Sequence, residues 1–196
     1  DAFNYDKIGI FKKENIEAGT KIKTCAANEF NDLGEKKIFK GLTRFNPSVN
    51  EMFFAQNVLI LEGTQDQIAV TTVLQNNGII SNRVEELDYS IIVAGSKNSI
   101  PFFQRVLNSF HIPYAILHDH DIVEGMNSND KDTHEKTNKS IADLANGNPV
   151  YTFPVKLETS LGLDKHLNDQ YYAHIFFQNS ENITDEVKDI ILKIFK

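Results

Sequence analysis

The sequence predicts an α/β protein with a mainly parallel sheet flanked by helices, a β-rich N-terminal extension and a helical C-terminal part. Two apolar runs, 57–62 and 113–119, have the length and character of strands buried on both faces. From Glu51 onward such runs alternate with longer helical segments, which favours right-handed crossovers between parallel strands. Each of the two runs also ends in acidic residues, so a functional edge is expected where the strands end.

The composition is that of a globular protein of one domain, or of one domain with an appendage. The chain has 196 residues, of which 41% are hydrophobic and 24% charged. Its single cysteine, Cys25, excludes an internal disulfide framework and fits a reducing cytoplasm. No apolar run approaches the roughly 18 residues of a membrane span, and the N-terminus lacks the features of a signal peptide. We therefore expect a cytoplasmic protein with no membrane partner.

Two further observations concern the chain as a whole. The net charge of −7 argues against a basic coat for nucleic acid. The chain also starts without Met, which indicates a processed protein or a piece of a longer one.

Residues 1–45 form the expected β-rich extension, either a hairpin or the tail of an upstream module. It contains two short β-like runs, Lys7–Phe11 and Thr20–Thr24, and a later segment, Glu35–Lys40, before the turn at Asn46-Pro47. The elements expected next are strand 57–62, helix 64–76, strand 89–94, helix 99–110 and strand 113–119.

The remainder of the chain begins with a polar segment, Glu124–Lys139, interpreted as an exposed loop that runs into a helix over about 134–146. The sequence Asn-Gly-Asn-Pro at 146–149 ends that helix. The pattern then predicts strand 150–155 and helices near 168–179 and 184–195, with Thr184 as the N-cap of the last helix.

The candidate functional residues lie where the two apolar runs end. Glu62 ends the first strand, Gly63 allows a sharp turn, and Asp66 falls on the first turn of the following helix. Asp119 and Asp121 end the other strand, and a spacing of two points both carboxylates the same way. Taken singly, these residues are more typical of a helix N-terminus, a solvated strand end and a turn-initiating Asp than of a metal site.

Together the four carboxylates are expected to converge at one edge of the sheet. Their repulsion would raise their pKa values unless a cation neutralised them, and carboxylate oxygens suit Mg²⁺ or Mn²⁺. His111, His118 and His120 match no zinc spacing, and we assign them supporting or exposed positions.

The turn after the middle strand is a candidate phosphate site. Backbone N–H groups at Gly95 and Ser96 could hold a phosphate, with Lys97 as its counter-charge; an ordinary strand-to-helix turn is the alternative. No G-x-x-x-x-G-K-[ST] motif occurs, so no P-loop ATP site lies within this chain.

The order Glu-Gly-x-x-Asp, Gly-Ser-Lys-Asn and Asp-His-Asp resembles a Toprim domain, the catalytic module of topoisomerases, bacterial primases and several nucleases. The segment 46–55, NPSVNEMFFA, is similar more specifically to the overcoming-lysogenization-defect (OLD) nucleases, a group that includes the Gabija-type phage-defence nuclease. In that family an N-terminal ABC-type ATPase is fused to a C-terminal Toprim nuclease. The resemblance implies a Rossmann-like Toprim domain over 46–156, a helical part over 157–196, and the end of an ATPase module in 1–45.

The resemblance also implies the site. Glu62, Asp66, Asp119, Asp121 and a later acidic residue, Glu158, would hold two metal ions, with catalytic roles for Glu62, Asp119 and Asp121. Glu158 is equally typical of a helix N-terminus, and Glu62 could instead act as a general acid or base. Gln170 stands where the family has a Lys in its helical part, and Gln cannot supply a positive charge to a transition-state phosphate.

The resemblance implies a divalent-metal-dependent DNA endonuclease in which two ions bridge the scissile phosphate. Its expected partners are DNA, an upstream ATPase module and a second copy of the chain. One alternative is a phosphotransfer α/β domain with a phosphorylated Asp. Another is a Toprim relic without activity that docks or dimerises an ATPase.

Overall fold

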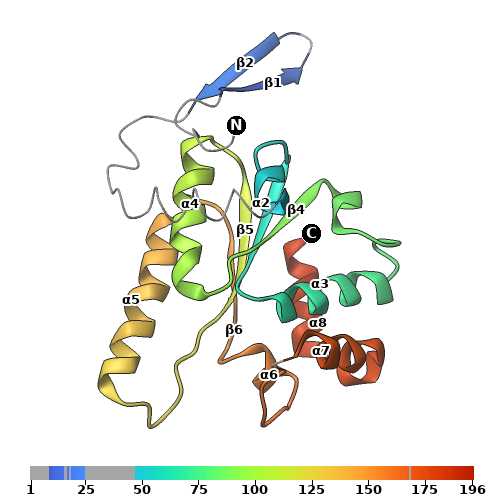
Figure 1. Cartoon of the computed structure of the whole chain (residues 1–196), viewed down its shortest axis with the longest axis vertical. Coiled ribbons are helices and arrows are strands. Elements are labelled where there is room, and N and C mark those ends of the chain that lie inside the picture. Colours follow the sequence, from blue (N-terminus) through green and yellow to red (C-terminus); the bar gives the residue numbers. More distant parts are fainter. Residues whose placement is uncertain (1–8, 16, 18, 25–46, 168) are drawn as a thin grey trace.

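A parallel sheet of four strands lies at the centre of the part of the chain that the structure, a computed structural model, describes (Figure 1). The described residues are 9–15, 17, 19–24, 47–167 and 169–196. The strand order is β4-β3-β5-β6, and all three pairings are parallel. The prediction of a mainly parallel sheet is therefore confirmed. The strands are β3 (Asn57–Leu61), β4 (Tyr89–Val93), β5 (Tyr114–Asp119) and β6 (Val150–Phe153).

The register brings the carboxyl ends of the strands to one edge. Leu61, the last residue of β3, pairs with Val93 of β4 on one side and with Leu117 of β5 on the other. Asp119 pairs with Phe153, the last residue of β6. Side chains that directly follow these strands therefore start from nearly the same level of the sheet.

Helices cover both faces of the sheet (Figure 1). The helices α4 and α5 lie on one side, and α3, α7 and α8 on the other. The longer helices are α3 (Thr64–Asn76), α4 (Ile100–Ser109), α5 (Ser128–Leu144), α7 (Gln170–Gln178) and α8 (Asp185–Ile194). Two short helices, α2 (Pro47–Glu51) and α6 (Leu157–Ser160), precede β3 and follow β6. This two-sided cover explains why the strands are continuous apolar runs.

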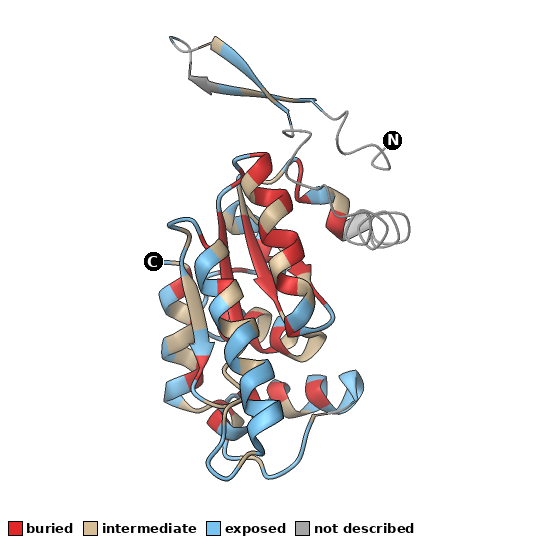
Figure 2. Ribbon diagram, turned by 90° about the vertical axis from the view of Figure 1, so that its left-hand side faces the viewer, coloured by how far each residue is buried: buried red, intermediate tan, exposed pale blue. Residues whose placement is uncertain are grey.

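The central strand β3 divides the core in two. Val58 and Ile60 pack in the cluster that contains α4, whereas Leu59 and Leu61 pack in the cluster with α3, α7 and α8. All four side chains are fully buried, and Figure 2 shows the buried residues concentrated along the sheet and the inner faces of its helices. Burial of both faces fixes β3 in place and with it the residues that follow.

The helix α5 begins about six residues earlier than the expected start at 134. Asn127 caps it, because its side-chain oxygen accepts a hydrogen bond of 3.0 Å from the backbone N–H of Asp130. The segment is polar because one residue alone, Ile141, is buried within the helix. Surface pairs such as Lys139 with Asp143, 2.9 Å apart, support a helix that hydrophobic periodicity could not indicate.

The N-terminal extension includes an antiparallel hairpin of β1 (Gly9–Asn15) and β2 (Gly19–Thr24), at the opposite end of the molecule from α6 (Figure 1). The expectation of two short strands in this region is confirmed. The segment Glu35–Lys40, Cys25 and most of the proposed 1–45 unit lie outside the described residues. No helix in the described ranges is long and apolar enough to cross a membrane.

Replacing Ile60 with Ala should lower the free energy of unfolding by about 2–5 kcal/mol, because a fully buried side chain of the central strand leaves a cavity. Urea denaturation measures the loss. The matched control is Ile22→Ala in the hairpin, where the side chain is 59% exposed and a change within about 0.5 kcal/mol is expected. Equal losses at both positions would contradict the central role of β3.

Candidate functional site

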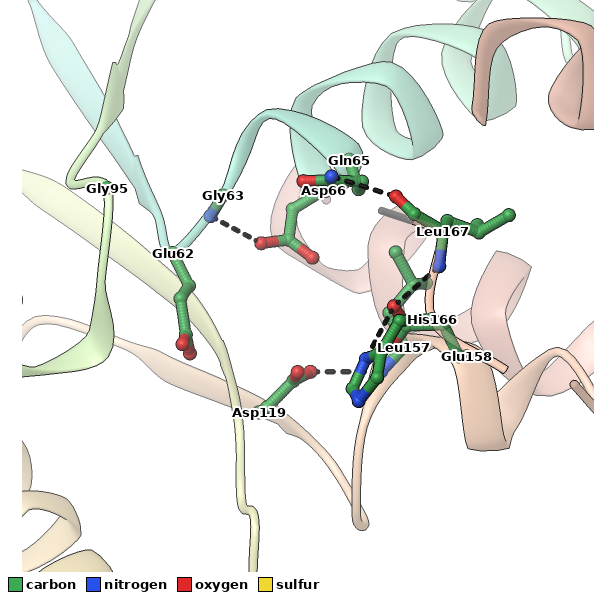
Figure 3. A pocket seen from close by; sticks show the side chains of 10 residues that line it. All are labelled: Glu62, Gly63, Gln65, Asp66, Gly95, Asp119, Leu157, Glu158, His166 and Leu167. Atoms are coloured by element: carbon green, nitrogen blue, oxygen red, sulfur yellow. Dashed lines mark hydrogen bonds and ion pairs between the residues drawn. The ribbon is translucent and has the colours of Figure 1, made fainter. Parts of the chain in front are cut away.

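A cavity of about 230 Å³ lies at the edge of the sheet where the strands end (Figure 3). Its walls come from the end of β3, the start of α3, the end of β5, the turn after β4, the helix α6 and a loop before α7. Four carboxylates line it. The lining residues are Glu62, Gly63, Gln65, Asp66, Gly95, Asp119, Leu157, Glu158, His166 and Leu167.

Glu62 follows the last residue of β3 and directs its carboxylate into the cavity (Figure 3). Its Oε2 atom is buried and accepts no hydrogen bond from the described part of the chain. Burial raises the pKa of Glu62, and the nearby Asp121 carboxylate raises it further. Lys97 and two backbone N–H groups oppose this pKa shift without reversing it. The Glu62 carboxylate is thus short of positive partners.

Asp66 lies on the first turn of α3, as the spacing predicted. Its Oδ2 accepts a hydrogen bond of 2.8 Å from the Gly63 backbone N–H, and the side chain is 7% exposed. Burial raises the pKa of Asp66 to about 7, against the effect of that hydrogen bond; the carboxylates of Glu62, Glu158 and Asp121 raise it further.

A glycine at position 63 leaves space for neighbouring side chains, and its backbone conformation is one that any residue can adopt. Its φ of −133° is ordinary extended backbone. A Cβ atom there would lie 3.2 Å from the Gln65 side-chain oxygen and 3.6 Å from Asp66 Oδ2. The expected reason for this glycine is therefore corrected: it leaves room at the wall of the cavity.

Asp119 ends β5 and directs its carboxylate toward the Leu157 backbone (Figure 3). Its Oδ1 accepts a hydrogen bond of 2.9 Å from the Leu157 backbone N–H. Burial raises the pKa of Asp119 to about 8, and repulsion from the Asp66, Glu62 and Asp121 carboxylates adds to the shift. The sequence predicts that repulsion between carboxylates raises these pKa values. For Asp119, burial raises the pKa more than that repulsion does.

Glu158 lies in α6 and is held by the loop before α7. Its Oε1 accepts a hydrogen bond of 3.2 Å from the Leu167 N–H and lies 3.4 Å from His166 Nδ1. The Gln65 side chain donates to the Leu167 carbonyl at 2.9 Å, which ties the same loop to α3. Sequence reasoning missed Gln65, His166 and Leu167, because the loop contains no motif and long-range contacts alone bring it to the site.

Asp121 differs from the other acidic residues, because it is not among those that line the cavity. Its φ is +62°, in the left-handed region, so the alternation of side chains along a strand ends at Asp119. The expectation that Asp119 and Asp121 point the same way is therefore wrong. Asp121 Oδ2 instead lies 2.6 Å from Lys97 Nζ.

The turn after β4 carries Lys97 inward. Lys97 is 5% exposed, and its ammonium also donates to the Asp119 and His120 carbonyls. It does not face solvent as a phosphate partner would. Gly95, at a φ of +78°, and Ser96 remain exposed on the same turn.

The histidines near β5 are outside the cavity wall. His118 is 2% exposed, and its Nδ1 lies 2.7 Å from the Asp119 carbonyl oxygen. Burial lowers the pKa of His118 to about 4, so the ring is neutral at pH 7. His111 is exposed and His120 is half-buried.

The donor set fits a hard divalent cation. The cavity is lined by carboxylate oxygens, and burial, with repulsion between neighbouring carboxylates, raises the pKa values of Asp66 and Asp119. One buried oxygen of Glu62 has no partner among the described residues. As the side chains stand, no three His, Cys, Asp or Glu groups of the described ranges surround one ion position. Binding an ion therefore requires rotation of these side chains.

Gln170 begins α7, and its amide donates to Thr64 Oγ1 at 3.3 Å. It thus stands beside the first residue of α3 and close to the cavity, without lining it.

Comparison with known proteins gives the context of this site. Residues 53–121 match the family model described as "Overcoming lysogenization defect protein-like, TOPRIM domain". The chain is 26% identical over 144 residues to the "OLD nuclease" of Thermus scotoductus (strain ATCC 700910 / SA-01). That alignment covers 68% of this chain and 27% of the relative, so the chain spans about a quarter of the relative's length.

Solved structures of two OLD proteins are also similar. The C-terminal region of the Burkholderia pseudomallei OLD protein is 15% identical with a TM-score of 0.42, and the match covers 71% of this chain and 81% of that one. The C-terminal region of the Xanthomonas campestris pv. campestris OLD protein is 15% identical with a TM-score of 0.39, covering 74% and 80%. Glu62, Asp66, Asp119 and Asp121 all fall within the segment that matches the family model. Residues 53–121 of this chain are therefore similar to an OLD-like TOPRIM domain.

Proposed function

We propose that this chain is the nuclease part of a longer OLD-like protein and hydrolyses DNA phosphodiester bonds with divalent metal ions. The observation that carries the proposal is the set of four carboxylates in one cavity. Burial raises the pKa values of Glu62, Asp66 and Asp119, and one buried oxygen of Glu62 has no partner among the described residues. A structural network would pair such groups with Lys or Arg. The TOPRIM match and the OLD nuclease relative support the same activity.

Glu62, Asp66, Asp119 and Glu158 would hold the ions, with Asp121 at the edge of the site. Mg²⁺ and Mn²⁺ are the fitting ions, because both prefer oxygen ligands and the cavity offers carboxylates. When bound, a pair of such ions polarises a phosphoryl oxygen and lowers the pKa of water. Glu62, Asp119 and Asp121 would be the catalytic residues, and the exposed Gly95 and Ser96 would contact a phosphate of the DNA.

The protonation states of two cavity carboxyl groups, Asp66 and Asp119, affect the proposed activity. Asp66 and Asp119, with pKa values of about 7 and 8, retain protons near neutral pH in the metal-free protein. They must release these protons to act as ligands, so ion binding and proton release are linked.

The rest of the proposal concerns the whole protein. The chain corresponds to about a quarter of the Thermus relative. From the resemblance to the OLD family, we propose that the longer protein also contains an ABC-type ATPase module. Regulation by that module, a homo-oligomer, a cytoplasmic location and a role in phage defence belong to the same proposal.

Substitution of Asp119 by Asn should abolish DNA cleavage and weaken Mn²⁺ binding, while leaving the metal-free fold equally or more stable. Asn retains an acceptor for the Leu157 N–H and removes the free-energy cost of protonating or burying a carboxylate in the cavity. Glu62→Ala should behave in the same way. Cleavage assays and melting curves with and without Mn²⁺ measure these effects, since an ion that binds the folded state raises its melting temperature.

The control for this experiment is Asp132→Asn on the exposed face of α5, where the acidic side chain is 67% exposed. It should change neither cleavage nor the stabilisation by Mn²⁺. The metal-nuclease proposal should be abandoned if Mn²⁺ does not stabilise the wild-type chain and the two cavity variants simply melt earlier.

The contribution of Asp119 to the stability of the metal-free protein should fall as pH rises from about 4 toward 8. The folded pKa of Asp119 is about 8 and lies above the ordinary value of about 3.9, so at this residue the folded state binds more protons than the unfolded state across this range. This contribution then decreases with increasing pH. Urea denaturation at several pH values measures the slope, which should be smaller in Asp119→Asn. A slope of opposite sign attributable to Asp119 would contradict its raised pKa.

Substitution of Gln170 by Lys should increase the cleavage rate, by at most about 10²–10³-fold, because a positive charge near the cavity favours a developing oxyanion. Single-turnover cleavage measures the rate. The matched control is Gln178→Lys at the far end of α7, also exposed, where no gain is expected. Equal gains from both variants would indicate general attraction of DNA instead of a specific role for position 170.

A further inference from the structure

Lys97 is a buried cation within an acidic edge. Its ammonium donates to Asp119 O at 3.1 Å, His120 O at 3.2 Å and Asp121 Oδ2 at 2.6 Å. An ammonium has three N–H donors, so these three acceptors satisfy it. The 5% exposure of the residue shows that the side chain is part of the site's interior.

The acceptors of this cation are held firmly by the main chain. The Asp121 N–H donates to Val155 O at 2.8 Å, and the His120 N–H donates to Phe153 O at 3.1 Å. The Asn138 side chain donates to His120 O at 2.9 Å. The turn after β5 is thus fixed from several sides, with the Asp121 carboxylate turned toward Lys97.

Asp121 and the cavity carboxylates therefore differ in how they are neutralised. Among the described residues, Asp121 has an ammonium partner, whereas Glu62, Asp66 and Asp119 have none within ion-pair distance. The nearest other positive candidate for Asp121 is His134, with Nδ1 at 3.7 Å. A carboxylate bound to an ammonium at 2.6 Å is not free to accept a metal ion through the same oxygen.

We propose that Lys97 is a resident cation that occupies the Asp121 side of the site, so that the DNA-free chain accepts one divalent ion. Asp121 becomes available to a second ion only after the ammonium has left it. This inference rests on the proposed function, because it assumes that the cavity carboxylates bind metal.

The chemistry of lysine suits such a displacement. The ammonium sits on a flexible four-carbon stem, and the turn that carries it has exposed neighbours at Gly95 and Ser96. A phosphate oxygen of DNA that reaches this turn offers the ammonium an acceptor of the same charge as Asp121. Lys97 would thereby couple the arrival of DNA to the release of Asp121, and it acts as a positioning residue.

The experiment is a titration with Mn²⁺ in the absence of DNA, followed by electron paramagnetic resonance of the free ion. The wild-type chain should bind one ion and Lys97→Met two. The control Lys139→Met removes an exposed lysine, 74% accessible and paired with Asp143 on α5, and should bind one ion. Mn²⁺ should also raise the melting temperature of Lys97→Met by more than it raises that of the wild type.

Asp121→Asn provides a test that does not depend on the folding of Lys97→Met. It should still bind one ion with wild-type affinity, because Asp121 is not a ligand while Lys97 holds it. Two ions on the wild type, one ion on folded Lys97→Met, or loss of the ion in Asp121→Asn would each overturn the proposal. Failure of the metal site itself would appear differently, as no bound ion on any variant, and would overturn the proposed function together with this inference.

Discussion

The parallel pairing of β3 with its two neighbours is the constraint on which the site depends. Because both faces of β3 are buried, its register against β4 and β5 cannot slip without exposing one half of the core. That register sets the level at which the chain leaves the sheet. Glu62 and Asp119 reach the same cavity because two buried strands end side by side.

The electrostatics of the cavity follow from this geometry. Side chains that emerge at a sheet edge beneath α3 and α6 lose much of their contact with water, and burial is the largest cause of the raised pKa values of Glu62, Asp66 and Asp119. Repulsion among the carboxylates adds to burial but does not dominate it. The fold thus uses the stability of its core to hold acidic groups in an arrangement that is unfavourable without a cation.

The sequence contains enough information to predict the places of Glu62, Asp66 and Asp119, because strand ends and helix first turns are local features. Their role as metal ligands stays a prediction. The direction of Asp121 could not be predicted, since the alternation rule applies only as far as the strand continues, and the backbone turns to positive φ at Asp121. The burial of the Lys97 side chain depends on hydrogen-bond acceptors at Asp119 and Asp121, more than twenty residues along the chain, and no local sequence pattern predicts these contacts.

The loop that holds Glu158 lies outside the segment that matches the TOPRIM family model, although it forms one wall of the cavity. The Gln65 side-chain amide donates a hydrogen bond to the Leu167 carbonyl, and the Leu167 N–H donates one to the Glu158 carboxylate. The site is therefore a composite of two regions that can diverge separately. Proteins with the same acidic residues at 62, 66 and 119 can therefore differ in this wall, and so in the shape of the cavity, without any change in those three residues.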